Sequence, residues 1–183
     1  MDSATQQSID VLSRALDQTA EVLSAVPADR LSDDTPCNDW DVAGLVAHVV
    51  AGPRNFVTMA SGGEPDWSAK PPLPADWTAE FRSAADDLMR MWNDAGESAS
   101  PGAVDSQIAE FAIHTWDLTR ATGQSIDLDP QIAQRSLDFM SGALTPDNRG
   151  DVFAPAVALP EDAPVYDRLV AFAGRDPHAH GPS

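Results

Sequence analysis

Cysteine, basic residues and long apolar runs are all scarce in this sequence. The single cysteine, Cys37, cannot form an internal disulfide. No apolar segment approaches the ~20 residues that a helix needs to cross a bilayer. The first residues, Met1–Gln7, have neither the basic start nor the apolar core of a secretory signal. We therefore expect a cytoplasmic protein that has no membrane partner.

The charge balance excludes further classes of partner. Eleven lysines and arginines stand against 29 acidic residues, which gives a formal net charge of −18. A field of that sign repels phosphate backbones and anionic lipid headgroups, so nucleic acid is an improbable partner. The sequence also has no glycine-rich phosphate loop and no alternation of strands and helices, which argues against a nucleotide-binding fold.

What the sequence does contain is a series of helical patterns. Its 183 residues, 43% of them hydrophobic, are enough for one domain with a real core. Apolar residues recur at three- and four-residue steps between capping and breaking residues. The expected helices cover 5–26, a segment starting at Val42 after the cap Asp41, a segment capped by Thr78, a segment ending at Gly123, one starting at Asp129-Pro130, and 165–174.

These segments predict an all-α fold, an antiparallel four-helix bundle with a C-terminal helical extension. We expect one domain over residues 1–183, with the core bundle at about 5–123, the extension at about 124–175 and a frayed tail at 176–183. Residues 61–77 should form an ordered loop, and 145–163 an irregular segment with a short extended piece within 152–159.

The fourth predicted helix carries a candidate metal site. Glu110 and His114 are four residues apart, so their side chains lie on the same helical face. A carboxylate and an imidazole at that spacing can bind one metal ion, but they can equally cap a polar pocket or pair with other side chains. The pair needs a third ligand from another element.

His48 is the candidate third ligand because it lies in the apolar stripe of the second predicted helix. Helix bundles build metal sites from side chains that project inward from facing helices. Two imidazoles and one carboxylate leave a coordination position open, and they suit zinc first, with nickel or iron as alternatives. The bland interpretation is that each histidine is a hydrogen-bonded core residue. His178 and His180 lie in the tail without a scaffold.

Three motifs resemble a known family. The segment Thr35–His48 resembles the signature that opens the second helix of DinB-like proteins, and more closely that of the metal-binding domain of mycothiol-dependent maleylpyruvate isomerases. The segment Glu110–Gly123 is similar to the second signature of that group, and Asp162–Pro177 to the end of a short actinobacterial metal-binding subfamily.

The resemblance implies a DinB-like bundle and a metal bound by His48, Glu110 and His114. It also implies a small-molecule substrate and a low-molecular-weight thiol as co-substrate. Two departures matter. Only about a dozen residues, 95–107, separate the third helix from the Glu–His pair, where family members carry a longer segment. The chain also has no room for the C-terminal domain of the larger isomerases, so we do not assign maleylpyruvate isomerisation.

Residues near these motifs have two interpretations each. Asp117, three residues after His114, could orient its imidazole, or could pair with Arg120 on the helix surface. Cys37 could be a fourth ligand or lie next to the ligands, although plain burial in a turn is the simpler expectation. Trp40 and Trp116 could be packing anchors or substrate platforms, and we expect packing anchors.

The sequence therefore favours a divalent-metal protein, a transferase, isomerase or hydrolase that acts on a small molecule with a thiol. The alternative is a non-catalytic bundle that binds metal or a partner protein. A plain helical interaction module without metal is the third hypothesis. We also consider a homodimer, because bundles with exposed tryptophan-bearing loops often self-associate.

Overall fold

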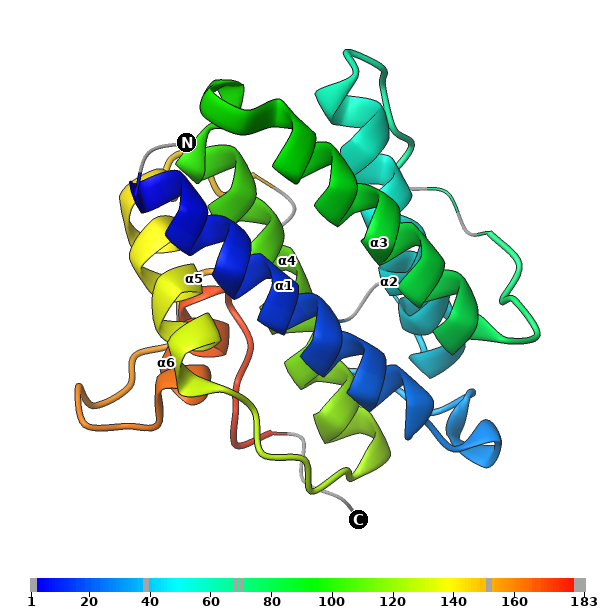
Figure 1. The fold of residues 1–183 in the computed structure, drawn as a ribbon. Coiled ribbons are helices and arrows are strands. Elements are labelled where there is room, and N and C mark those ends of the chain that lie inside the picture. The colour runs from blue at the N-terminus through cyan, green and yellow to red at the C-terminus, as the bar shows by residue number, and fades with distance from the viewer. Residues whose placement is uncertain (1–2, 38–39, 68, 70, 151–152, 180–183) are drawn as a thin grey trace.

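The computed structural model describes residues 3–37, 40–67, 69, 71–150 and 153–179, and these residues form helices and no β-strand (Figure 1). The prediction of an all-α fold is thereby confirmed. No helix within the described ranges is both long and apolar enough to cross a membrane. The helices are α1 Ser3–Ser24, α2 Val42–Ala60, α3 Trp77–Ala95, α4 Pro101–Thr122, α5 Pro130–Ala143 and α6 Val165–Phe172, with short 3-10 turns at Ala28–Arg30 and Gly96–Ser98.

Most helix ends follow the capping residues expected from the sequence. The Asp41 carboxylate accepts a hydrogen bond from the Gly44 N–H at the start of α2, and Asp129 accepts one from the Gln131 N–H at the start of α5. Gly123 ends α4 in the left-handed conformation, with φ of 66°. The prediction that Thr78 caps α3 is wrong. The cap is Asp76, whose carboxylate accepts a hydrogen bond from the Ala79 N–H.

This earlier start of α3 has a clear physical reason. Trp77 becomes the first helical residue, and its indole N–H donates to the carbonyl of Leu23 at the end of α1, at 2.9 Å. An aspartate at the cap satisfies the first-turn N–H as well as a threonine would. The long 61–76 connection is therefore anchored to α1 at the point where it becomes α3.

Four helices form the bundle, and two pack outside it. Helix α1 packs against α4 and α3, and α2 packs against α3 and α4, so the four close around one core (Figure 1). Helices α1 and α4 run in the same direction, since Thr5 lies next to Ala99 at one end and Gln124 donates to the Val22 carbonyl at the other. Helix α5 covers α4 and α1, and α6 packs on α5.

The core passes directly beneath the candidate site. Phe111 in α4 is 1% exposed, and its ring contacts Phe56 of α2 and Phe81 of α3, with ring centroids 5.8 and 5.9 Å apart. Edge-on aromatic contacts of this kind stabilise a core beyond the area that they bury. Because Phe111 follows Glu110 directly, the packing of three helices holds the backbone of that carboxylate in place.

The C-terminal segment is more ordered than the sequence suggested. Described residues 153–159 form no strand, but the Val157 N–H donates to the Ala171 carbonyl at 2.9 Å and attaches the segment to α6. The tail was expected to fray from residue 176, yet Pro177 is buried and its carbonyl accepts a hydrogen bond from Arg120. His180 lies outside the described residues.

Replacing Phe111 with alanine should destabilise the fold by about 3–5 kcal/mol, because it removes a fully buried ring that joins three helices. Urea unfolding of the metal-free protein measures this loss. Phe139 of α5 is only partly buried, so Phe139→Ala is the matched control with a smaller expected loss. Equal losses for the two variants would contradict the central role given to Phe111.

Candidate metal centre

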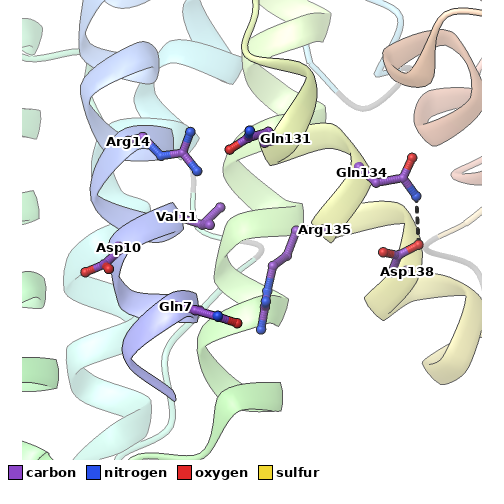
Figure 2. A pocket seen from close by; sticks show the side chains of 8 residues that line it. All are labelled: Gln7, Asp10, Val11, Arg14, Gln131, Gln134, Arg135 and Asp138. Carbon is purple, nitrogen blue, oxygen red and sulfur yellow. Dashed lines mark hydrogen bonds between the residues drawn. The ribbon is translucent and has the colours of Figure 1, made fainter. Parts of the chain in front are cut away.

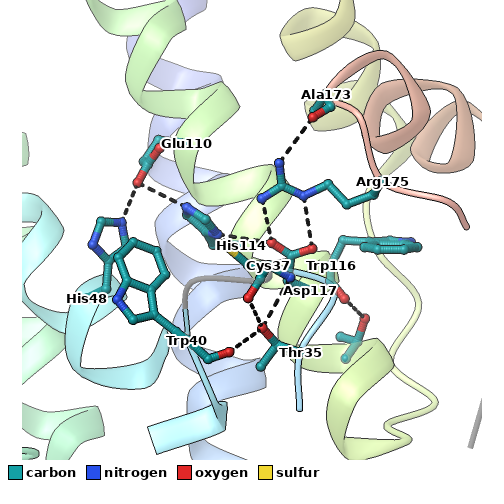
Figure 3. Close-up of polar contacts among 11 residues, drawn as sticks. Thr35, Cys37, Trp40, His48, Glu110, His114, Trp116, Asp117, Ala173 and Arg175 are labelled. Atoms are coloured by element: carbon teal, nitrogen blue, oxygen red, sulfur yellow. Dashed lines mark hydrogen bonds and ion pairs between the residues drawn. The ribbon is translucent and has the colours of Figure 1, made fainter. Parts of the chain in front are cut away.

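The structure brings His48, Glu110 and His114 together, as the sequence predicted. His48 comes from α2 and the other two residues from α4, and one potential ligand atom of each lies within 4.8 Å of the others (Figure 3). The Nε2 atoms of His48 and His114 lie 2.8 and 3.3 Å from the same oxygen, Glu110 Oε1. Both imidazoles therefore direct their outer nitrogens at one point between the two helices.

The turn before α2 determines how the His48 ring lies. Thr35 Oγ1 is 2.8 Å from the carbonyl oxygens of both Cys37 and Trp40, and it accepts a hydrogen bond from the Cys37 N–H. This network holds Trp40 so that its indole stacks on the His48 imidazole, with ring centroids 4.1 Å apart. Trp40 is thus a packing anchor, as expected, and what it packs against is a candidate ligand.

Asp117 contacts the other nitrogen of His114. Its Oδ2 lies 3.1 Å from His114 Nδ1, and its side chain is 0% exposed. The alternative, a surface pair with Arg120, is wrong, because Arg120 donates instead to the Pro177 carbonyl. The partner of Asp117 is Arg175, which donates from Nη2 to Oδ2 at 3.0 Å and from Nε to Oδ1 at 3.3 Å (Figure 3).

Sequence reasoning missed Arg175 although the residue lies in the third motif quoted above. Arg175 is separated from Asp117 by 58 residues and follows the last helix, so no helical spacing relates the two. The only signal was that a buried carboxylate on α4 would need a cation from another element. The structure supplies it from the C-terminal extension.

Glu110, His114 and Asp117 hold one another in their charged forms. Burial would raise the pKa of Glu110, but the charge and hydrogen bonds of His114 and His48 outweigh it and hold this pKa well below its usual range. Burial would lower the pKa of His114, but Glu110 and Asp117 raise it to about 9. Although burial opposes it, contact with His114 and Arg175 likewise lowers the pKa of Asp117.

These donors fit a divalent metal ion. An ionised Asp117 can only accept hydrogen bonds, so His114 donates to it from Nδ1 and directs Nε2 into the cluster. Two imidazole nitrogens and one carboxylate oxygen make a set typical of zinc, nickel or iron sites that keep an open position. The Glu110 side chain is 30% exposed, against 8% and 10% for the histidines, so the cluster opens to solvent beside the carboxylate.

Residues 12–119 match the family described as "Mycothiol maleylpyruvate isomerase N-terminal domain". The chain belongs to this family. Two relatives from Mycobacterium tuberculosis are each 33% identical to this chain in an alignment of 176 residues that covers 88% of this chain and 94% of theirs. They are the uncharacterized proteins MT0763 of strain CDC 1551 / Oshkosh and Rv0738 of strain ATCC 25618 / H37Rv. No solved structure matches the chain significantly. The family match includes all three cluster residues and ends before Arg175.

In this member of the family, Cys37 lies beside the cluster. Its sulfur forms a second group with His114 and Asp117, whose potential ligand atoms also lie within 4.8 Å of one another. Asp117 in that group is already bound to Arg175, and Cys37 is buried. The first group, which has two inward-facing imidazole nitrogens and a partly exposed carboxylate, is therefore the better candidate for a cation site.

A separate groove of about 440 Å³ lies between α1 and α5 (Figure 2). None of the residues that line it belongs to the histidine cluster. Its two arginines are committed to other groups, Arg14 to Asp129 and Arg135 to Asp105 and Ser8. The groove therefore offers no free cation to an anionic ligand.

Metal binding near neutral pH should release about one proton per ion, because His114, with its pKa raised to about 9, must lose a proton to become a ligand. The apparent affinity for zinc should accordingly rise as the pH increases from 7 towards 9. Calorimetric titration in buffers of different ionisation enthalpy measures the released protons. A binding enthalpy that is the same in all buffers would contradict this expectation.

Proposed function

We propose that this protein binds one divalent metal ion through His48 Nε2, His114 Nε2 and the Glu110 carboxylate. The observation that carries the proposal is the convergence of both Nε2 atoms on Glu110 Oε1 from two different helices. Two histidines that were only packed in the core would not both have to contact the same carboxylate oxygen. Zinc is the first candidate, and nickel and iron fit the same donors.

The chemistry follows from an open site with three protein ligands. A bound divalent ion supplies Lewis-acid chemistry, which makes a coordinated water or thiol a nucleophile near neutral pH. The side chains themselves hold and orient: Asp117 fixes the His114 ring, and Trp40 covers one face of the His48 ring. Trp67, with its centroid 6.2 Å from that of His48, adds a second aromatic wall.

We propose further that the protein is a metal-dependent transferase, isomerase or hydrolase that acts on a small molecule with a low-molecular-weight thiol. Membership of a mycothiol-related isomerase family and the partly exposed Glu110 support this hypothesis. The reaction named in the family description is not carried over to this chain. The alternative is a bundle that binds metal without catalysis, which would not bring a thiol to the ion.

Protein purified without a histidine tag should contain about one zinc, nickel or iron ion per chain, as three protein ligands suffice for one ion. Elemental analysis measures this content. The variants His48→Ala and His114→Ala should each lose the ion, because two remaining donors do not hold it through purification.

The matched control is His178→Ala, which removes an exposed histidine from the tail and should retain the metal. Retention of metal by both cluster variants would show that the ligands are assigned wrongly. Absence of metal from the parent protein, even after incubation with zinc, would remove the site.

If a thiol is a co-substrate, adding one to cobalt-substituted protein should produce a sulfur-to-cobalt charge-transfer band in the near ultraviolet. Absorption spectroscopy measures that band, and the same experiment with Cys37→Ser distinguishes the added thiol from the protein's own sulfur. An unchanged spectrum at saturating thiol would favour the non-catalytic bundle.

A further inference from the structure

We propose that Arg175 is a positioning residue of the metal centre, and that the C-terminal extension is thereby part of the site. The inference rests on the proposed function, since it concerns how the chain presents His114 to the ion. Among the described residues, Arg175 makes no hydrogen bond to any of the three proposed ligands. It acts through Asp117.

The contact between Arg175 and Asp117 has the geometry of an orienting pair. Two guanidinium nitrogens donate to the two different oxygens of Asp117, at 3.0 and 3.3 Å, so the plane of the carboxylate is held as well as its position. The Asp117 side chain is fully buried, at 0% exposure, and that of Arg175 is largely covered, at 10%. A carboxylate buried to this degree needs a partner, and removal of one member of such a pair is costly.

The held carboxylate determines which nitrogen of His114 is free. Asp117 Oδ2 receives a hydrogen bond from Arg175 on one side and from His114 Nδ1 on the other. With the carboxylate so fixed, the neutral imidazole that binds metal carries its hydrogen on Nδ1 and presents the Nε2 lone pair to the cluster. Without Arg175, neither the rotation of Asp117 nor the hydrogen bond to His114 is fixed by any other described cation.

The backbone after α6 forms a turn that directs the Arg175 guanidinium towards α4. Gly174 adopts φ of 88°, a left-handed conformation that favours glycine, and a Cβ there would lie 2.6 Å from the Ala154 carbonyl oxygen. The next residue turns back, so that the Arg175 N–H donates to the Val170 carbonyl at 2.9 Å. Arg175 Nη1 also reaches the Ala173 carbonyl. The side chain is thus aimed at α4 by its own turn.

Two other arginines attach the same extension without touching Asp117. Arg149 donates to the Phe172 and Ala154 carbonyls, and Arg120 donates to the Pro177 carbonyl. They allow two explanations to be distinguished. If Arg175 matters only because it attaches the extension to α4, loss of Arg120 should weaken metal binding to a similar extent. If it positions His114, only loss of Arg175 affects the metal.

The experiment compares Arg175→Gln, Arg175→Lys and Arg120→Gln with the parent protein. Zinc affinity is measured by competition with a chromophoric chelator, and the visible spectrum of the cobalt form reports the ligand geometry. Arg175→Gln should lose about 10–100-fold in affinity, the usual effect of removing an outer hydrogen-bond partner, and should shift the cobalt bands. Arg175→Lys, which keeps the charge but not the paired contacts, should lose less, and Arg120→Gln should match the parent.

Each result decides between the alternatives. A folded Arg175→Gln with parental affinity and spectrum would overturn the inference while leaving the metal site intact. An equal loss in Arg120→Gln would also overturn it, in favour of simple docking. If Arg175→Gln fails to fold, Arg175→Lys carries the test, and a parental spectrum for it would count against a need for the paired contacts. Failure of the parent protein to bind zinc would instead refute the proposed function and, with it, any metal centre to position.

Discussion

The carboxylate of Glu110, which two imidazoles share, joins helix α2 to helix α4. Glu110 on α4 meets His48 of α2 and His114 of its own helix at one oxygen, Oε1. Such an arrangement is unfavourable unless positive charge or hydrogen-bond donors surround the carboxylate, because burial penalises the charged form. The raised pKa of His114 and the contact of His48 Nε2 with Glu110 Oε1 meet that requirement in the metal-free protein, and a divalent cation would meet it with a larger charge.

The surroundings of this contact make it rigid from both sides. Phe111 holds the backbone of α4 against α2 and α3. The turn at Thr35 holds the Trp40 indole stacked on the His48 ring. Behind His114, the charges of Asp117 and Arg175 neutralise each other. The negative charge that remains for an incoming cation is that of Glu110, on the side that is open to solvent. This local balance, more than the net charge of −18, suits the cluster to the proposed cation.

Local rules accounted for much of what the sequence allowed us to predict. The caps Asp41 and Asp129 and the stop at Gly123 depend on short-range hydrogen bonds and backbone conformation, so they could be predicted. The meeting of His48 with Glu110 and His114 was suggested by helical periodicity and by the expectation that polar residues on facing helices gather, and the family resemblance of the motifs strengthened it. Asp76 was missed in favour of Thr78 because both are good caps, and the tertiary contact of Trp77 with Leu23 decided between them.

Long-range contacts of irregular segments could not be predicted in the same way. Nothing near Asp117 in the sequence indicates that its partner is Arg175, and the pairing with Arg120 satisfied the helical rule but not the structure. The order of the tail at Pro177 depends on the same side chain of Arg120. Each miss concerns a group whose partner is far along the chain, where periodicity carries no information.

Location of the metal in crystals of the zinc-loaded protein, by anomalous diffraction at the zinc edge, tests the central claim most directly. The account predicts one peak at about 2.0–2.1 Å from the Nε2 atoms of His48 and His114 and about 2.0–2.2 Å from a Glu110 oxygen. A zinc ion bound by Cys37 or by His178, with the pair of contacts to Glu110 Oε1 left intact, would contradict it.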